Sequence, residues 1–294
     1  MIIKKPNFFI IGAPKCGTTS LAKWLDYHPN IFFSNPKEPA FFNSDHFGGI
    51  RSEKEYLKLF RNSNSNHLAI GEGTTHYIYS KYAIKNILKF QQDAKFIICL
   101  RNPIDTALSM HSERVFQGEE PEKSFEKAWK LEKDREKGIG IPLSMSSNPE
   151  LIQYGKLCKF SYWIDQIYKK VKRNHILILL LDDLKENPSN AFNKVLDFLN
   201  VKEKINIQFE KFNTAKQVRS IYISRFIHFS IYLKRKLLGN FKTSIAAFLR
   251  NLNTYNRKNK KMSDKLRKEM LEFFNDDILR LESLIGRKLD NWKK

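Results

Sequence analysis

The sequence predicts an α/β fold with a central parallel sheet and helices on both of its faces. Unbroken apolar runs at Phe8–Ile11, before Arg101 and at Ile176–Leu181 are the main evidence. Strands of a parallel sheet are covered on both faces, so they read as continuous apolar runs rather than alternating ones. A helical pattern follows each run, and this strand–helix alternation is typical of α/β proteins.

The first strand leads into a glycine-bounded loop, Gly12–Gly17, and then into a helical pattern that begins at Ser20. Strand, loop and helix N-terminus together form an anion-binding site, because unpaired amides and the positive end of the helix dipole face the loop. Both glycines and Thr19 fit the phosphate-loop spacing, but Thr18 occupies the lysine position and the lysine lies inside the loop, at Lys15. We therefore expect a P-loop-like, three-layer fold whose loop is not built for a magnesium-bound triphosphate.

The stretch Pro14–Leu21 resembles the 5′-phosphosulfate loop of sulfotransferases that use 3′-phosphoadenosine 5′-phosphosulfate (PAPS). The resemblance implies that the donor is bound by Lys15, Cys16, Gly17, Thr18, Thr19 and Ser20. It also makes Lys15 catalytic, because an ammonium group can neutralise charge on the bridging and leaving phosphate oxygens.

A short strand at Ile31–Phe33 precedes a stiff loop in which two prolines bracket Lys37 and Glu38. Loops at the carboxyl ends of parallel strands line the site in open α/β sheets, so we expect Glu38 to face the phosphate loop. A carboxylate there can take the proton of a hydroxyl that attacks sulfur. The segment 37–42 resembles the Lys-Glu-x-x-Phe-Phe loop of glycan-modifying, heparan sulfate type sulfotransferases, which implies that Glu38 is the general base. Ala40 stands where several of those enzymes have a histidine, and an exposed structural Lys–Glu pair is the alternative interpretation.

A third short strand is predicted at residues 68–70, followed by Glu72 and His76. Gly73 occupies a position where the family often has a lysine. Glu72 and His76 are candidates for contacts with the acceptor or for an alternative base. Either side chain could instead hydrogen-bond to the loop backbone.

The buried strand that ends at Arg101 continues into Asn102, a helix-capping residue, and Pro103, which suits the first helical position. Ser109 follows about two turns into the helix. Arginine offers a planar fork of donors to a phosphate, and serine adds a hydroxyl. This arrangement resembles the family's 3′-phosphate motif, which implies that Arg101 and Ser109 bind the 3′-phosphate of PAPS.

Residues 214–262 hold twelve Lys and Arg residues and no Asp or Glu, interleaved with aromatic and aliphatic residues. Such a segment fits an amphipathic helix on an anionic membrane surface, a face that grips an acidic polymer, or a helical layer with a basic outer side. Lys216 and Arg219 stand where family members close a cationic loop over the nucleotide. An amphipathic helix at 263–285 is expected to close a single domain that spans residues 1–294.

Composition limits the remaining possibilities. The chain has 52 Lys and Arg against 31 Asp and Glu, a net charge of +21 that attracts anions. Its three cysteines show no metal-ligand spacing and no disulfide framework, which favours a reducing compartment. The sequence shows neither the apolar core of a signal peptide nor an apolar run near the ~20 residues of a membrane span. We therefore expect a cytoplasmic protein, with a peripheral membrane contact through residues 214–262. No motif reads bases, so no nucleic-acid partner is expected.

These features predict an enzyme that transfers the sulfuryl group of PAPS to a hydroxyl of a glycan, glycolipid or small metabolite, releasing 3′,5′-ADP without a metal. Two alternatives remain. One is a kinase that uses the same loop, against which Thr18 counts. The other is a non-catalytic basic module that binds membranes or anionic polymers through a nucleotide-binding fold.

Overall fold

The computed structural model describes residues 4–45, 49–210 and 262–294, together with 216–218, 223, 230 and 254–256. The chain divides into two compact units. Unit 1 comprises Met1–Asn102, Phe160–Asn213 and Asp276–Lys293, and unit 2 comprises Pro103–Lys159, Thr214–Asn275 and Lys294. The single domain expected from the sequence remains a prediction.

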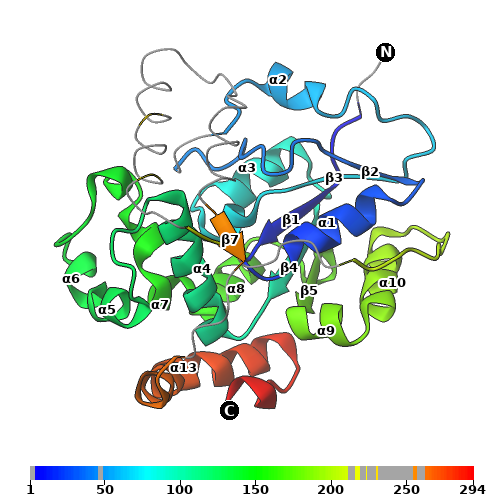
Figure 1. Ribbon diagram of the computed structural model, residues 1–294. Helices are drawn as coiled ribbons and strands as arrows, with labels where there is room; N and C mark the ends of the chain where they lie inside the picture. Colours follow the sequence, from blue (N-terminus) through cyan, green and yellow to red (C-terminus); the bar gives the residue numbers. More distant parts are fainter. Residues whose placement is uncertain are drawn as a thin grey trace. The chain divides into compact units, whose positions relative to one another are not determined.

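Unit 1 contains a five-stranded sheet of order β2-β3-β1-β4-β5, and every neighbouring pair of its strands is parallel (Figure 1). The parallel sheet predicted from the apolar runs is confirmed. Its strands are β1 (Phe8–Gly12), β2 (Ile31–Phe33), β3 (Ala69–Gly73), β4 (Lys95–Leu100) and β5 (Ile176–Leu180).

Strand β1 lies at the centre, where Ile10 is in register with Gly73 of β3 and with Ile97 of β4. All five of its residues are buried. The six-residue apolar run at Ile176–Leu181 predicts a central strand, and this prediction is wrong. Strand β5 is at one end of the described strand order, and its first three residues are half-buried. An apolar run reports how well a strand is covered, but it does not report the position of that strand in the sheet.

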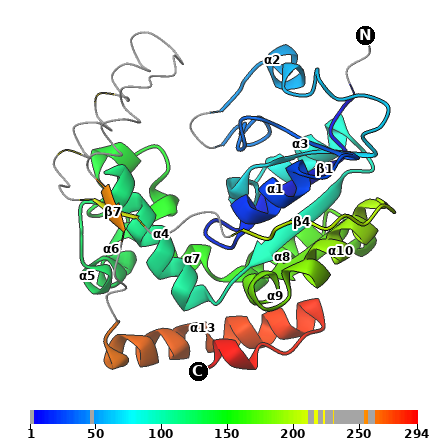
Figure 2. The same cartoon turned by 45° about the vertical axis from the view of Figure 1, so that its right-hand side comes forward.

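The helices of unit 1 cover both faces of this sheet, which confirms the three-layer arrangement. The crossovers from β1 to β2 and from β3 to β4 run in opposite directions across the sheet, so their right-handed connections place α1 (Thr18–Asp26) and α3 (Ala83–Phe90) on opposite faces (Figures 1 and 2). Phe209 contacts both α1 and α10 (Pro188–Leu199), through Trp24 at 5.0 Å and Phe192 at 5.8 Å between ring centroids. This unit also contains α2 (Glu53–Lys58), α8 (Phe160–Tyr168) and α9 (Leu181–Glu186).

Unit 2 is largely helical. The charged stretch 119–137 predicts one helix, but the structure has two short helices there, Phe125–Lys130 and Glu132–Glu136. Ser124 caps the first of them by accepting a hydrogen bond from the Lys127 amide. The amphipathic pattern at 155–168 likewise predicts one helix, but the structure has two there, Tyr154–Leu157 and Phe160–Tyr168. The elements of this unit are α4 (Pro103–Gln117), α5 (Phe125–Lys130), α6 (Glu132–Glu136), α7 (Tyr154–Leu157) and the antiparallel pair β6 (Lys216–Val218) and β7 (Thr254–Asn256).

The closing helix predicted at 263–285 is α13 (Asp264–Ile285), whose residues are divided between the two units. The chain also contains 3₁₀ turns at Thr75–Tyr79, Leu143–Met145, Pro149–Ile152, Arg173–His175 and Asp290–Trp292. None of the described helices is both long enough and apolar enough to cross a membrane.

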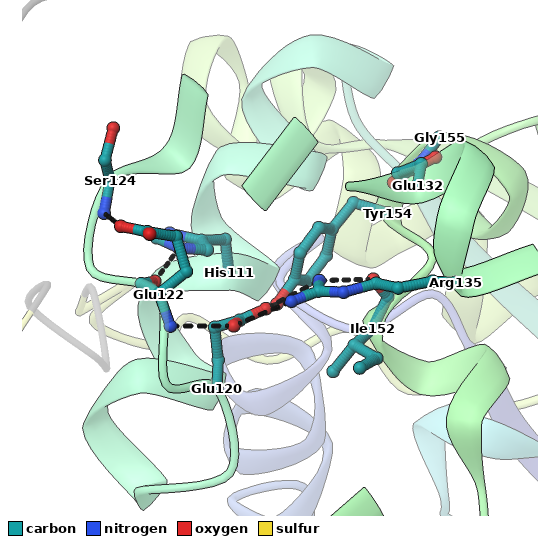
Figure 3. Close-up of polar contacts among 9 residues, drawn as sticks. All are labelled: His111, Glu120, Glu122, Ser124, Glu132, Arg135, Ile152, Tyr154 and Gly155. Carbon is teal, nitrogen blue, oxygen red and sulfur yellow. Dashed lines mark hydrogen bonds and ion pairs between the residues drawn. The ribbon is translucent and has the colours of Figure 1, made fainter. Parts of the chain in front are cut away.

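A buried ion pair joins the segments of unit 2 (Figure 3). The Arg135 guanidinium donates to both carboxylate oxygens of Glu120, at 2.8 and 2.9 Å, and also to the Ile152 carbonyl at 3.1 Å. The Tyr154 hydroxyl and the Glu122 amide donate to the same carboxylate, both at 2.9 Å. Side-chain exposure is 1% for Arg135 and 0% for Glu120, so each charge depends on the other for its solvation.

We expect Arg135→Met to lower the free energy of unfolding of the chain by about 3 to 5 kcal/mol, because it leaves the Glu120 carboxylate buried without its partner. Urea unfolding followed by circular dichroism measures this. The matched control is Lys130→Met, which breaks the ion pair between Lys130 and Glu126. These two side chains are 64% and 45% exposed, so the loss of their pair should lower the free energy of unfolding by less than about 1 kcal/mol. Equal losses in the two variants would contradict a buried, mutually dependent pair.

Candidate active site at the carboxyl edge of the sheet

The loop that follows β1 is held against the neighbouring strand. The Ala13 amide donates to the Cys99 carbonyl of β4 at 2.6 Å. Gly17 ends the loop with φ 90°, and a Cβ atom there would lie 2.8 Å from Cδ1 of Leu181. Glycine is therefore required at position 17 by its backbone conformation and by the close approach of α9.

Helix α1 begins at Thr18, two residues earlier than the sequence pattern predicted. Its N-terminal cap is Gly17, which has no side chain to accept hydrogen bonds from the first-turn amides, and the first turn contains no acidic residue. The helix end therefore suits an anion from outside the chain. Lys15, with φ 66°, Thr19 and Ser20 are half-buried beside it, whereas Thr18 and Cys16 are buried.

Glu38 lies in the loop after β2 and is tied to the end of β3, because its amide donates to the Gly73 carbonyl at 2.9 Å. Its side chain is 41% exposed, and its carboxylate accepts from Lys37 Nζ at 2.8 Å and from the Thr75 hydroxyl at 3.2 Å. Burial alone would raise the pKa of Glu38, but the charges of Lys37 and His76, with the two hydrogen bonds, hold that pKa below its usual value. Glu38 is therefore an accessible, ionised carboxylate at neutral pH.

The lysine that pairs with Glu38 lies beside Gly73. A Cβ atom on Gly73 would lie 3.5 Å from Cε of Lys37 and 3.2 Å from the Phe33 ring. The Lys37 stem thus passes over the glycine where the family often has a lysine, and its side chain is 20% exposed. The Lys37 side chain therefore supplies a cation near the end of β3, although this lysine comes from the loop after β2 and not from position 73.

Glu72 is inside β3 rather than beyond it, because β3 extends three residues past the predicted strand end. Its side chain has no solvent exposure. Three hydroxyls donate to its carboxylate: Tyr77 at 2.8 Å, Thr74 at 2.8 Å and Tyr56 at 3.3 Å. Burial raises the pKa of Glu72 to about 7, even though these hydrogen bonds favour the charged form.

The backbone brings three strand ends of unit 1 together. The Thr74 amide, just after β3, donates to the Ile10 carbonyl of β1 at 3.0 Å, and Ala13 is bonded to β4 as described above. Glu38 is attached to the end of β3, the phosphate loop follows β1, and Arg101 directly follows β4. Lys15, Glu38 and Arg101 therefore all come from the same edge of one sheet.

The remaining predicted donor-binding residues belong to unit 2. Ser109 is half-buried in α4. Lys216 begins β6, but its side chain and the whole of Arg219 lie outside the described residues, as does most of the basic segment 214–262.

Residues 5–276 match the sulfotransferase domain. The chain belongs to the sulfotransferase domain family.

Two curated relatives illustrate this sulfotransferase-family membership. The chain is 35% identical over 106 residues to the membrane-associated sulfotransferase kil1 of Dictyostelium discoideum, a match that covers 36% of this chain and 22% of that protein. It is 26% identical over 249 residues to carbohydrate sulfotransferase 15 of Rattus norvegicus, covering 67% of this chain and 44% of that protein. The chain thus spans less than half the length of either relative.

Among solved structures, the crystal structure of a sulfotransferase from Alicyclobacillus acidocaldarius matches with a TM-score of 0.74 and 24% identity. The match covers 99% of this chain and 100% of that one, so the sulfotransferase-family fold extends over the chain.

The hydroxyl residues that surround the carboxylates of Glu38 and Glu72 were not identified from the sequence. Thr75 donates to Glu38, while Thr74, Tyr77 and Tyr56 donate to Glu72. The run Thr74-Thr75-His76-Tyr77 was a signal for the first three, because hydroxyl and imidazole groups gathered at a strand end need partners. Tyr56 is 16 positions before Glu72 and gave no comparable signal. Within the described ranges, no group of three or more His, Cys, Asp or Glu could hold a metal ion.

We expect Lys37→Met to raise the pKa of Glu38, because it removes the ammonium group 2.8 Å from the carboxylate while desolvation of that carboxylate remains. Glu38 would then lose its proton at a higher pH. Carbon-13 NMR of side-chain carboxyls, titrated in wild type and variant, measures the change. Lys81→Met, an exposed lysine outside this loop, serves as the control. An unchanged or lowered Glu38 pKa in Lys37→Met would show that the pair does not exist in solution.

Proposed function

We propose that this chain transfers the sulfuryl group of PAPS to an acceptor hydroxyl and releases 3′,5′-ADP. The observation that carries the proposal is the common sheet edge of unit 1, from which a phosphate loop, an accessible ionised carboxylate and a strand-terminal arginine all arise. Membership of the sulfotransferase domain family supports the same reaction.

The donor roles follow from the residue types and their positions. The first-turn amides of α1, with Thr18 and Thr19, would hold the 5′-phosphate, because this helix end lacks a side-chain cap and an acidic residue. Lys15 would neutralise charge on the bridging and leaving oxygens. Arg101 would bind the 3′-phosphate through its planar donors, and Ser109, Lys216 and Arg219 remain predicted donor contacts.

Glu38 would be the general base. As the acceptor oxygen forms its bond to sulfur, the proton of that hydroxyl moves to the carboxylate, and the sulfur–oxygen bond to the phosphate breaks. The electron pair of the broken bond stays with 3′,5′-ADP, so no metal and no redox partner is needed. The lowered pKa of Glu38 keeps it in the basic form at neutral pH.

A carbohydrate hydroxyl is the acceptor class that we favour. One relative is named a carbohydrate sulfotransferase, and others are heparan sulfate N-deacetylase/N-sulfotransferases. We also propose a cytoplasmic location with a peripheral membrane contact through residues 214–262. Its support is the basic, aromatic-rich composition of that segment and a relative that is named membrane-associated.

We expect the wild-type chain to transfer ³⁵S from labelled PAPS to a carbohydrate acceptor, and Glu38→Gln to lower kcat by about 10²- to 10⁴-fold by removing the general base. Binding of 3′,5′-ADP, measured by calorimetry, should survive, since Glu38 is not a donor ligand. Acceptors are screened as glycan, glycolipid and small-metabolite fractions.

The matched control for this substitution is Glu55→Gln, an exposed glutamate in α2 of the same unit. Near-normal turnover in Glu38→Gln would refute the base assignment. Phosphoryl transfer from ATP, with no transfer from PAPS by the wild-type chain, would refute the proposed reaction itself.

Arg101→Ala should weaken 3′,5′-ADP binding by about tenfold or more, because a charge-assisted, bidentate contact to phosphate is lost. Isothermal titration calorimetry compares it with Arg61→Ala, which removes an exposed arginine of unit 1 away from the strand ends. The same affinity in both variants would remove Arg101 from the donor site.

A further inference from the structure

Each backbone amide from Glu38 to Phe42 donates a hydrogen bond, apart from position 39, where proline has no amide proton. The Glu38 amide donates to Gly73, residue 39 is a proline, and the next three amides donate to side-chain hydroxyls. The Ala40 amide donates to Thr74 at 3.2 Å, and the amides of Phe41 and Phe42 donate to Tyr77 at 3.0 and 3.2 Å. Two hydroxyls thus hold three consecutive amides.

A hydroxyl has one proton, and its remaining capacity is for accepting. Thr74 and Tyr77 both donate that proton to the buried carboxylate of Glu72, at 2.8 Å in each case. The ionised form of Glu72, which prevails above its pKa of about 7, only accepts hydrogen bonds and therefore fixes the direction of both hydroxyls. Their lone pairs are therefore left for the loop amides.

The backbone of this loop needs such support. Glu38 has φ 65° and Ala40 has φ 50°, a left-handed region that non-glycine residues seldom adopt. Conformations of this kind persist only where the surrounding structure determines them. The bonds from Glu72 through Thr74 and Tyr77 supply that constraint at residues 40–42, directly after Glu38.

We propose that Glu72 is a positioning residue, whose buried carboxylate orients Thr74 and Tyr77 so that the 38–42 backbone holds Glu38 in the geometry needed for proton transfer. This inference rests on the proposed sulfotransfer, in which Glu38 is the base. It also assigns Glu72 a role other than direct contact with the acceptor, in keeping with its complete burial.

Tyr77 and Tyr56 provide a matched pair of tests. Both hydroxyls donate to the same oxygen of Glu72, but only that of Tyr77 accepts from the loop amides. We expect Tyr77→Phe to lower kcat about 10- to 100-fold, with the Kd of 3′,5′-ADP unchanged, because the base is misplaced while the donor site is intact. Tyr56→Phe, which keeps the ring that stacks on Phe41, should stay within about threefold of wild type, since the hydrogen bond that is lost involves no loop amide.

Hydrogen exchange gives a readout that does not depend on activity. Peptides that cover residues 39–43 should exchange at least about tenfold faster in Tyr77→Phe than in Tyr56→Phe, because two amides lose their acceptor. Thr74→Val should behave like Tyr77→Phe, and Thr74→Ser, which keeps the hydroxyl, should restore both kcat and protection. Glu72→Gln should also lower kcat and protection, because its amide nitrogen cannot accept the hydroxyl proton.

Equal kcat and equal exchange in Tyr77→Phe and Tyr56→Phe would overturn the inference, as would a Thr74→Ser variant no better than Thr74→Val. Failure of the proposed function looks different: the wild-type chain would not transfer sulfate from PAPS, whatever the exchange contrast shows. If Glu72→Gln does not fold, the tyrosine and threonine pairs still decide the question.

Discussion

The hydrogen bonding of β1 to both β3 and β4 determines where the candidate site residues of unit 1 can lie. Because all three strands are parallel, their carboxyl ends meet at one edge of the sheet. The phosphate loop leaves β1 there, and Arg101 leaves β4 there. Glu38 comes from a loop before β3, but its amide is bonded to the last residue of β3. One pairing pattern thus gathers residues from three distant parts of the chain.

Two carboxylates at this edge have opposite environments. Lys37, His76 and Thr75 hold the pKa of Glu38 below its usual value, whereas burial raises the pKa of Glu72 to about 7. The two pKa values shift in opposite directions, which suits the two carboxylates to different roles. The accessible carboxylate of Glu38 suits proton transfer, and the enclosed carboxylate of Glu72 suits the organisation of hydrogen bonds. The buried charge is tolerated because three hydroxyls solvate it, and two of them, those of Thr74 and Tyr77, link it to the neighbouring loop.

Much of the fold was predictable from particular residues. The apolar runs marked the strands, and the glycines at positions 12 and 17 marked the loop after β1. Errors occurred where local pattern carries no spatial information. The run at 176–181 could not show that β5 lies at the end of the strand order, and the charged stretch at 119–137 concealed a cap at Ser124. The position of the Lys37 side chain over Gly73 could not be predicted either, because a glycine in the sequence does not show which side chain lies next to it.

The sequence by itself determined the order of strands and helices, the phosphate loop and the candidates Lys15, Glu38 and Arg101, because these depend on local periodicity and residue type. Only the tertiary structure decided the role of Glu72. Its burial, and its links through Thr74 and Tyr77 to the loop of Glu38, require residues 30 or more positions apart to meet across strand ends. No local pattern can specify such contacts, since they arise when the parallel sheet assembles and its carboxyl edge brings the loops together.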